Sequence, residues 1–309
     1  MTEEDFDRII ATYPYPIAGI LRRLRTVECL DPGNAKYDCI IDTAEAVTRF
    51  LSVLVLCLCR DHAETSGVVA SAPWSANLTK TLARPSWGHW MEITREGLKW
   101  LHERGEPSPL AARLTEFFFD HPPKESQSAQ ALGRLLTIRN DVAHKRKPKT
   151  LPHELESLCE QTQADLMTVI ESIGFLANYS LTFVVKIEVS KRRHKEPDFR
   201  HSMVRPIVGG DFPAVKKSLS AALESNSVLL RQGEAGPYLN LDPLLVYDTS
   251  GKAPDLFFFN GMKSPSTMEY VACKHGGEFD SARSARAHEL AEEMQYLLKA
   301  LTPPAGASS

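Results

Sequence analysis

One short segment of the sequence combines side chains that can act on a phosphodiester. Residues 139–144 read RNDVAH, so Arg139 lies five positions and Asn140 four positions before His144. Residues four apart share a face of an α-helix, which predicts that Asn140 and His144 lie side by side. A histidine can transfer a proton near neutral pH, and an arginine can stabilise a phosphorane. The combination predicts RNA cleavage by attack of a 2′-hydroxyl, with Asn140 orienting the histidine or holding the phosphate.

The Arg-x4-His spacing carries little information without its context. By chance, a chain with this many arginines and histidines contains roughly 0.6 such pairs, and this sequence contains three. Arg84…His89 includes Pro85, which biases the preceding residue away from helix. Arg283…His288 falls on a charge-rich terminal segment. We interpret these two pairs as surface residues.

Two neighbouring features distinguish the 139–144 segment. The apolar residues 135–138 precede it and predict a helix anchored to a core. Four cations follow it and form a local patch that attracts phosphate: Lys145, Arg146, Lys147 and Lys149. The hexapeptide alone can be explained as surface polarity that complements a helix dipole, but this context favours a functional site. The segment has no neighbouring cluster of carboxylates for Mg²⁺, so the sequence predicts a reaction without metal or other cofactor.

The elements that position this segment are predicted to be helices up to about residue 180. Asp38–Arg60 is apolar almost all round, which predicts a central helix. Ser86 is expected to cap a helix over 87–103, and Ser108 with Pro109 to start one that reaches Asp120. The helix that ends in the 139–144 segment is predicted to start at Ser126 or Ser128. A long amphipathic helix is predicted over 153–179.

The character of the sequence changes at about residue 181. Runs rich in β-branched and aromatic residues predict strands at 181–189, 203–208, 227–231, 238–241, 244–247, 256–259 and 268–272. A final helix is predicted over 281–301. The prediction is therefore a multidomain α + β protein, with a helical domain over 1–180 and a β-rich domain over 181–309. We place the junction near the basic stretch Lys191–His201, interpreted as a solvated linker with RNA binding as the alternative.

Composition narrows the class of protein. The 309 residues are 43% hydrophobic and 24% charged, with a net charge of −3, so no overall basic field indicates nucleic acid. The six cysteines contain no CxxC pair, and Cys273 with His275 lacks a second pair of ligands, so neither a zinc site nor a disulfide framework is predicted. No glycine-rich phosphate loop is present. The acidic first residues and the short apolar run Leu51–Cys59 predict a cytoplasmic protein without membrane spans.

Residues 136–144 also resemble the signature of HEPN domains, in which an arginine, a polar residue and a histidine end a penultimate helix. The resemblance covers roughly residues 1–180, including Glu45 in the early helix and the long helix after the motif. It implies an all-α bundle that forms homodimers, with the two motifs facing each other across a cleft. Active members are metal-independent endoribonucleases of toxin–antitoxin, abortive-infection and CRISPR-associated defence systems.

By this resemblance, Arg139, Asn140 and His144 occupy catalytic positions, and Asp141 and Glu45 support them. Some toxin members carry a tyrosine two positions after the histidine, as a target of their antitoxin, whereas this chain has Arg146 there.

Two functions follow from the sequence. The first is a dimeric HEPN-type endoribonuclease of bacterial defence or toxin type, whose C-terminal domain senses a trigger or restrains activity. The second is a non-catalytic module that dimerises through its helices and binds a partner or ligand through its β-rich domain. The aromatic run Phe257–Phe259, taken as exposed, supports the second hypothesis.

Overall fold

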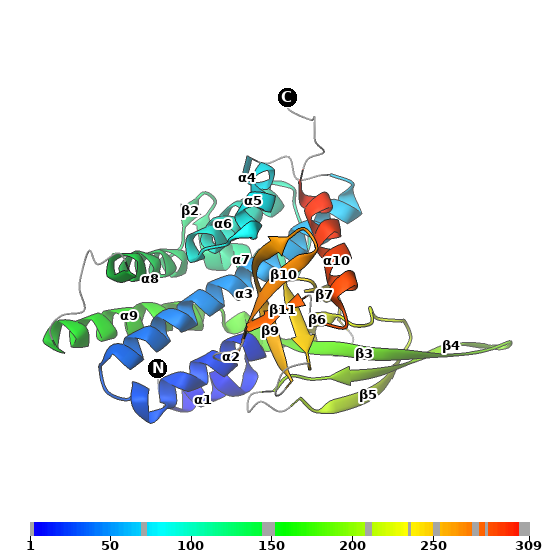
Figure 1. Ribbon diagram of the computed structural model, residues 1–309, viewed down its shortest axis with the longest axis horizontal. Coiled ribbons are helices and arrows are strands. Elements are labelled where there is room, and N and C mark those ends of the chain that lie inside the picture. Colours follow the sequence, from blue (N-terminus) through cyan, green and yellow to red (C-terminus); the bar gives the residue numbers. More distant parts are fainter. Residues whose placement is uncertain are drawn as a thin grey trace.

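The computed structural model describes residues 3–68, 73–143, 152–207, 212–233, 236–249, 254–273, 278–281 and 284–302. It has the expected α + β character, with a helical N-terminal part, a β-rich C-terminal part and a terminal helix (Figure 1). The α-helices are α1 (Glu3–Thr12), α2 (Tyr15–Leu21), α3 (Asn34–Ser66), α4 (Pro73–Ala76), α5 (Leu78–Ala83), α6 (Trp87–Glu103), α7 (Pro109–Phe118), α8 (Gln127–Ala143), α9 (Pro152–Ser172) and α10 (Ala287–Leu301). Short 3-10 helices are η1 (Arg22–Arg25), η2 (Val27–Cys29) and η3 (Gly174–Asn178).

Helix α3 is the centre of the molecule, as its apolar sequence predicts. Its 33 residues include an unbroken buried stretch from Val47 to Arg60. Helix α6 packs closely along it, because a Cβ atom at Gly97 would lie 2.4 Å from Val55 Cγ1. The predicted cap of α6 is confirmed: Ser86 Oγ accepts from the His89 backbone N–H, and His89 Nδ1 accepts from that of Ser86. This capping role accounts for His89, so no functional site is needed to explain this histidine.

The strands form two larger sheets and one small hairpin. The hairpin pairs β1 (Phe119–His121) with β2 (Lys124–Glu125). A five-stranded sheet has the order β5-β4-β3-β6-β7, and a four-stranded sheet has the order β11-β10-β9-β8. Their strands are β3 (Tyr179–Arg192), β4 (Lys195–Val204), β5 (Ala214–Leu219), β6 (Val228–Gln232), β7 (Tyr238–Asn240), β8 (Leu245–Asp248), β9 (Asp255–Ser264), β10 (Thr267–Ala272) and β11 (Glu278–Asp280). All pairs in both sheets are antiparallel.

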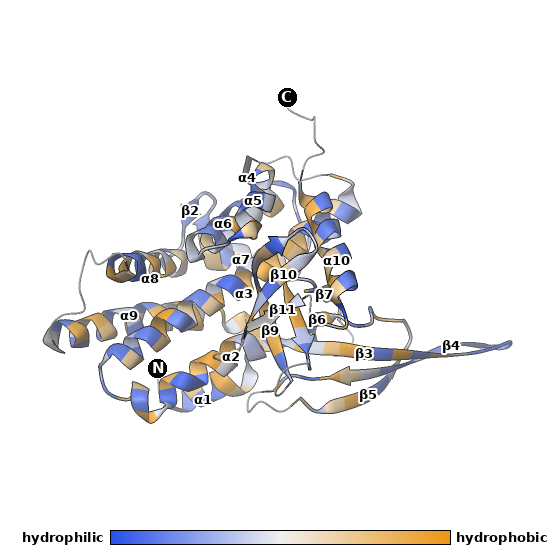
Figure 2. Ribbon diagram, viewed as in Figure 1, coloured by the Kyte–Doolittle hydropathy of each residue, from blue (hydrophilic) through white to orange (hydrophobic). Residues whose placement is uncertain are grey.

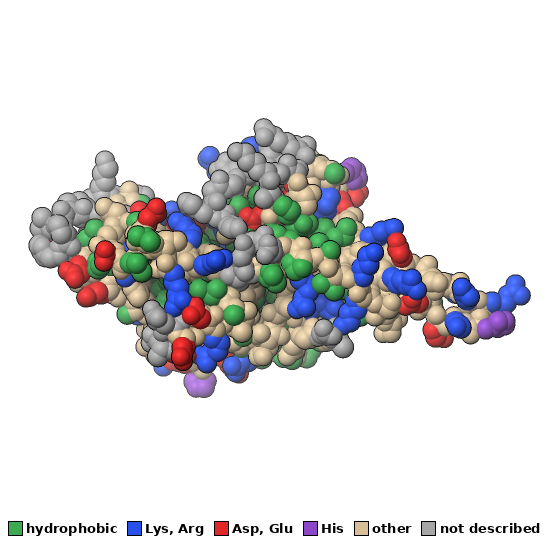
Figure 3. All heavy atoms as spheres, turned by 90° about the horizontal axis from the view of Figure 1, so that it is seen from below, with side chains coloured by type: hydrophobic (Ala, Val, Ile, Leu, Met, Phe, Trp, Pro, Cys, Tyr) green, Lys and Arg blue, Asp and Glu red, His purple; other side chains and the backbone are tan. Residues whose placement is uncertain are grey.

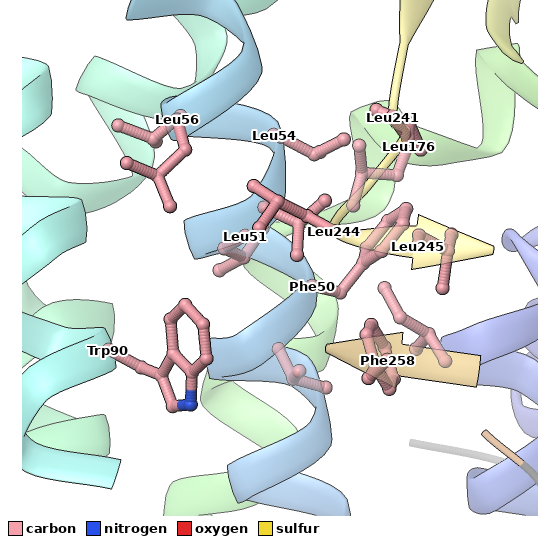
Figure 4. Close-up of a cluster of buried hydrophobic side chains, with 14 of the residues drawn as sticks. Phe50, Leu51, Leu54, Leu56, Trp90, Leu176, Leu241, Leu244, Leu245 and Phe258 are labelled. Carbon is pink, nitrogen blue, oxygen red and sulfur yellow. The ribbon is translucent and has the colours of Figure 1, made fainter. Parts of the chain in front are cut away.

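The helical and β-rich parts share one hydrophobic core. Figure 4 shows α3 between Trp90 of α6 on one side and residues of β8 and β9, including Phe258, on the other. Phe50 of α3 meets Phe258 edge to face, with ring centroids 6.4 Å apart. The run Phe257–Phe259 is buried, so the prediction that it is exposed is wrong. An apolar face on α3 and an apolar face on the sheet cover each other.

Polar contacts reinforce the junction between the two parts. Arg60 of α3 is buried and donates to the carbonyl oxygens of Asn240 (2.9 Å) and Asp242 (3.0 Å). The carboxylate of Asp242 accepts from the Val228 backbone N–H at 2.9 Å and pairs with Arg286, which precedes α10. Burial raises the pKa of Asp242, and Arg286 acts in the opposite direction. None of the described helices is long and apolar enough to cross a membrane.

The basic stretch at 191–201 is not a linker, and this correction changes the architecture. Strands β3 and β4 pair from Phe183↔Val204 out to Arg192↔Lys195, with register shifts at Val184/Lys186 and Ser190/Arg192. The stretch therefore forms the far end of a β-hairpin. His201 is buried at its base, between the Phe199 carbonyl and the Leu223 N–H. The high charge of the stretch concealed the strand in the sequence. Residues 191–196 are exposed, because they belong to a hairpin that projects from the body (Figures 1 and 2).

Candidate functional site

The described part of the sequence motif, residues 139–143, lies at the C-terminal end of α8, as predicted. Arg139 and Asn140 are both half-buried, and Arg139 Nη1 donates to Asn140 Oδ1 at 3.2 Å. Ile138 and Val142, four residues apart, pack against the main core. The core therefore fixes the rotation of this helical turn and holds the arginine and the asparagine together.

Helix α8, which carries the motif, runs antiparallel to α9 and is held to it by side-chain contacts. Ser128 donates to Ser172 at 2.6 Å near one end of the pair. Farther along, Arg134 makes a bidentate ion pair with Asp165, with a shortest distance of 2.6 Å. The same register places Arg139 opposite the turn of α9 that contains Cys159.

The start of α3 completes the surroundings of Arg139. Tyr37 lies in the first turns of α3, where burial raises the pKa of its phenol to about 12 and the nearby charge of Arg139 acts in the opposite direction. Cys159 of α9 donates to the carbonyl oxygen of Gly33, just before α3. The ends of α8, α3 and α9 thus meet around a guanidinium, which is an anion-binding group.

The structure brings only some of the predicted site residues to this turn of α8. His144 and the four cations Lys145, Arg146, Lys147 and Lys149 fall outside the described residues, as does His275. Asp141 is half-buried in the last turn of α8. Glu45 lies about two turns along α3 from Tyr37 and pairs with Arg49 at 3.2 Å. Arg49 in turn donates to Asn260 of β9, so Glu45 belongs to the junction with the sheet.

A cavity of about 310 Å³ between α3, the 106–110 segment and the sheet carries groups that sequence analysis missed. His62 Nδ1 and Glu106 Oε2 are within hydrogen-bond distance at its wall, and both side chains are largely buried. The Ser108 backbone N–H donates to the other oxygen of Glu106 at 3.1 Å. A histidine held through Nδ1 can use Nε2 as a base or acceptor. His62 and Glu106 are 44 residues apart, so no spacing in the sequence could have joined them.

A carboxylate-rich groove adjoins this cavity and shares Asp61, Thr65 and Tyr238 with it. Burial raises the pKa of Asp61, Glu64 and Glu293, while Arg60 lowers it in each case. Repulsion from neighbouring carboxylates, including Glu224, adds to the rise. Among the described residues, no group of three or more histidine, cysteine, aspartate or glutamate side chains is arranged to hold a metal ion.

Comparisons with known proteins found no relative of this chain. No protein-family model matches it, and neither a curated protein nor a solved structure is significantly similar to it. Membership of the HEPN family therefore stays a prediction from the motif.

Proposed function

We propose that this protein is a metal-independent endoribonuclease of HEPN type, with Arg139, Asn140 and His144 as its catalytic residues. The observation that supports this most is the contact between Arg139 and Asn140 in the last described turn of α8. That turn is anchored by the core and braced by α9, and His144 is the next residue but one after Val142 in the sequence. Catalysis needs side chains that are held in place, because a displacement of about 1 Å can lower the rate by about 100-fold.

The proposed reaction is transesterification within the RNA. His144 accepts the proton of a ribose 2′-hydroxyl, and the 2′-oxygen forms a bond to the adjacent phosphorus. The bond from phosphorus to the 5′-oxygen breaks, and that oxygen takes a proton from a protonated histidine. The products are a 2′,3′-cyclic phosphate and a 5′-hydroxyl end. Arg139 stabilises the phosphorane, and Asn140 orients the histidine or the phosphate.

The residues after the motif have a separate role in this proposal. Lys145, Arg146, Lys147 and Lys149 attract RNA phosphates to a chain whose net charge is −3. The active form is a homodimer through the helical part, in which two motifs share one cleft. A cytoplasmic role in bacterial defence or as a toxin completes the proposal, with Asp141 as a supporting residue. Glu45 is not part of the proposed site, because it pairs with Arg49 at the junction with the sheet.

The cavity beside His62 favours a second candidate function. A concave site with a few polar groups is typical of small-molecule binding, and this one lies where the helical and β-rich parts meet. In that case the protein is a non-catalytic module that binds a ligand, and the motif on α8 serves dimerisation. The ligand can equally be the trigger of an active nuclease.

The two candidates are separated by RNA cleavage in the presence of EDTA. We expect His144→Ala and Arg139→Ala to lower the rate by about 100-fold or more, with 5′-hydroxyl and cyclic phosphate ends only in the wild type. His288→Ala is the matched control, because it belongs to another Arg-x4-His pair and its side chain is 87% exposed. Equal degradation by EDTA-treated wild type and by His144→Ala would remove the nuclease proposal and leave the binding module.

A further inference from the structure

The β3–β4 hairpin extends beyond the rest of its sheet as an arm, defined here as residues 185–200. Strand β6 pairs with β3 only as far as Phe183, and β5 pairs with β4 only as far as Phe199. Residues 190–198, the tip of the arm, are therefore paired only with each other. Figure 1 shows this arm projecting along the longest axis, on the side of the molecule opposite to helices α8 and α9. The arm adds little to the core, so stability does not explain its length.

The charges of the molecule are divided unequally between this region and the body. Residues 185–200, the arm, contain six Lys and Arg against three Asp and Glu, a net charge of +3. The other residues therefore carry −6, which gives the chain its total of −3. Figure 3 shows blue Lys and Arg side chains along the arm to its end. The arm is the part of the protein suited to a polyanion.

The tip concentrates this charge in four exposed cations: Lys191, Arg192, Arg193 and Lys195. Within the part of the chain that the structure describes, none of the four has an ion pair. Of the three acidic residues of the arm, Glu188 pairs with Lys186 and Asp198 pairs with Arg200. The third, Glu196, is exposed in the tip, where the four cations outnumber it. The pKa of Glu188 is lowered by Lys186 first, and also by Lys216 and Arg200, so cations dominate this side of the arm.

Distance isolates the tip from the acidic body. Val189 is the last residue of β3 whose partner on β4, Phe199, is also paired with β5. Arg193 lies four residues farther along the chain, which corresponds to about 13 Å of strand. Charges separated by more than about 8 Å in physiological salt are largely screened from each other. The tip therefore presents a positive potential to an approaching ligand although the whole chain is acidic.

We infer that the tip of the arm binds the phosphate backbone of base-paired RNA. The four clustered cations match the dense phosphates of a double helix, and arginine holds phosphate through two hydrogen bonds. The tip contains no Phe, Tyr or Trp, the large rings on which a single-stranded site stacks successive bases, and its one ring is the imidazole of His194. The choice of RNA rests on the proposed function. Because the arm and the end of α8 lie at opposite ends of the molecule, an RNA that contacts both must be long.

Binding is tested in the His144→Ala protein, so that RNA is not cut and the result does not depend on the nuclease proposal. The tip variant carries Lys191→Gln, Arg192→Gln, Arg193→Gln and Lys195→Gln. We expect its Kd for an RNA duplex of about 30 base pairs to rise at least tenfold in about 0.15 M salt. The slope of log K against log salt should fall by about 3 to 4, nearly one for each cation.

Two controls separate this site from general charge and from misfolding. The variant with Lys80, Arg104, Lys124 and Lys299 changed to Gln removes four exposed cations outside the arm, and its Kd should change less than about twofold. Arg192→Lys with Arg193→Lys keeps the charge and should retain binding within a few-fold. If the quadruple tip variant melts earlier than wild type, Lys191→Gln with Arg193→Gln replaces it, with half the change in slope.

The inference is overturned if the tip variant binds the RNA duplex as tightly as the control variant. It is also overturned if single-stranded RNA or duplex DNA of the same length binds more tightly than duplex RNA through the same residues. A third contrary result is a tip-dependent affinity for vesicles with about one third phosphatidylserine together with unchanged RNA affinity. The same four tip substitutions, made in the protein that keeps His144, should leave cleavage of short RNA normal. This result together with the loss of duplex binding supports both the arm and the nuclease.

Discussion

Replacing Phe258 by alanine tests whether the helical and β-rich parts unfold together. Phe258 lies in β9, is 2% exposed and contacts the ring of Phe50 on α3. Truncating a buried phenylalanine costs about 3–5 kcal/mol, and about 0.5–1.5 kcal/mol of this can come from the ring pair. Since domains are stable by about 5–15 kcal/mol, the loss should move the urea midpoint of the whole chain strongly downward.

Tryptophan fluorescence provides the assay, because all four tryptophans lie in the helical part, between residues 74 and 100. A mutation in the β-rich part can shift their transition only if the two parts are coupled through the shared core. We expect the urea unfolding curves of Phe258→Ala measured by fluorescence and by far-ultraviolet circular dichroism to coincide. Both should give a free energy of unfolding about 3–5 kcal/mol below that of the wild type.

Val189→Ala is the control for this experiment, because Val189 is 60% exposed on the arm, and it should change stability by less than about 0.5 kcal/mol. A tryptophan transition that stays at its wild-type midpoint in Phe258→Ala, while the remaining dichroism signal shifts, would refute the shared core. Residues 1–180 would then be an independent domain. The double-mutant cycle with Phe50→Ala should give a coupling of about 0.5–1.5 kcal/mol.

Two further predictions concern the support of the motif and the acidic groove. Arg134→Gln removes the bidentate pair with Asp165 and should cost about 1–2 kcal/mol in urea unfolding, and it should slow RNA cleavage because the end of α8 loses its brace. If Arg134→Gln cleaves RNA at the wild-type rate, the Arg134–Asp165 pair does not support the catalytic site. Glu293 has a raised pKa in the folded state, mainly through burial, so its ionisation destabilises the fold as the pH rises through that value. Glu293→Gln should therefore be more stable than wild type by about 0.5 kcal/mol at neutral pH, and the gain should vanish toward pH 4, as urea unfolding at both pH values will check.

The amino-acid sequence by itself determined the helices with strong local signals. The caps at Ser86 and Ser126 and the proline at Pro109 set where α6, α8 and α7 begin, because these signals act within one turn. The apolar circumference of α3 showed that it is central. The position of Arg139 at the end of an anchored helix followed in the same way from the apolar residues before it.

Only the tertiary structure decided which elements meet. The sequence cannot tell that β3 pairs with β6 as well as β4, because this pairing joins segments separated by the whole of β4 and β5. The covering of α3 by α6 on one side and by β8 and β9 on the other depends on the same long-range contacts. His62 and Glu106 become neighbours for that reason. The basic stretch at 191–201 is strand rather than linker, because backbone pairing between β3 and β4 outweighs the low strand propensity of its charged side chains.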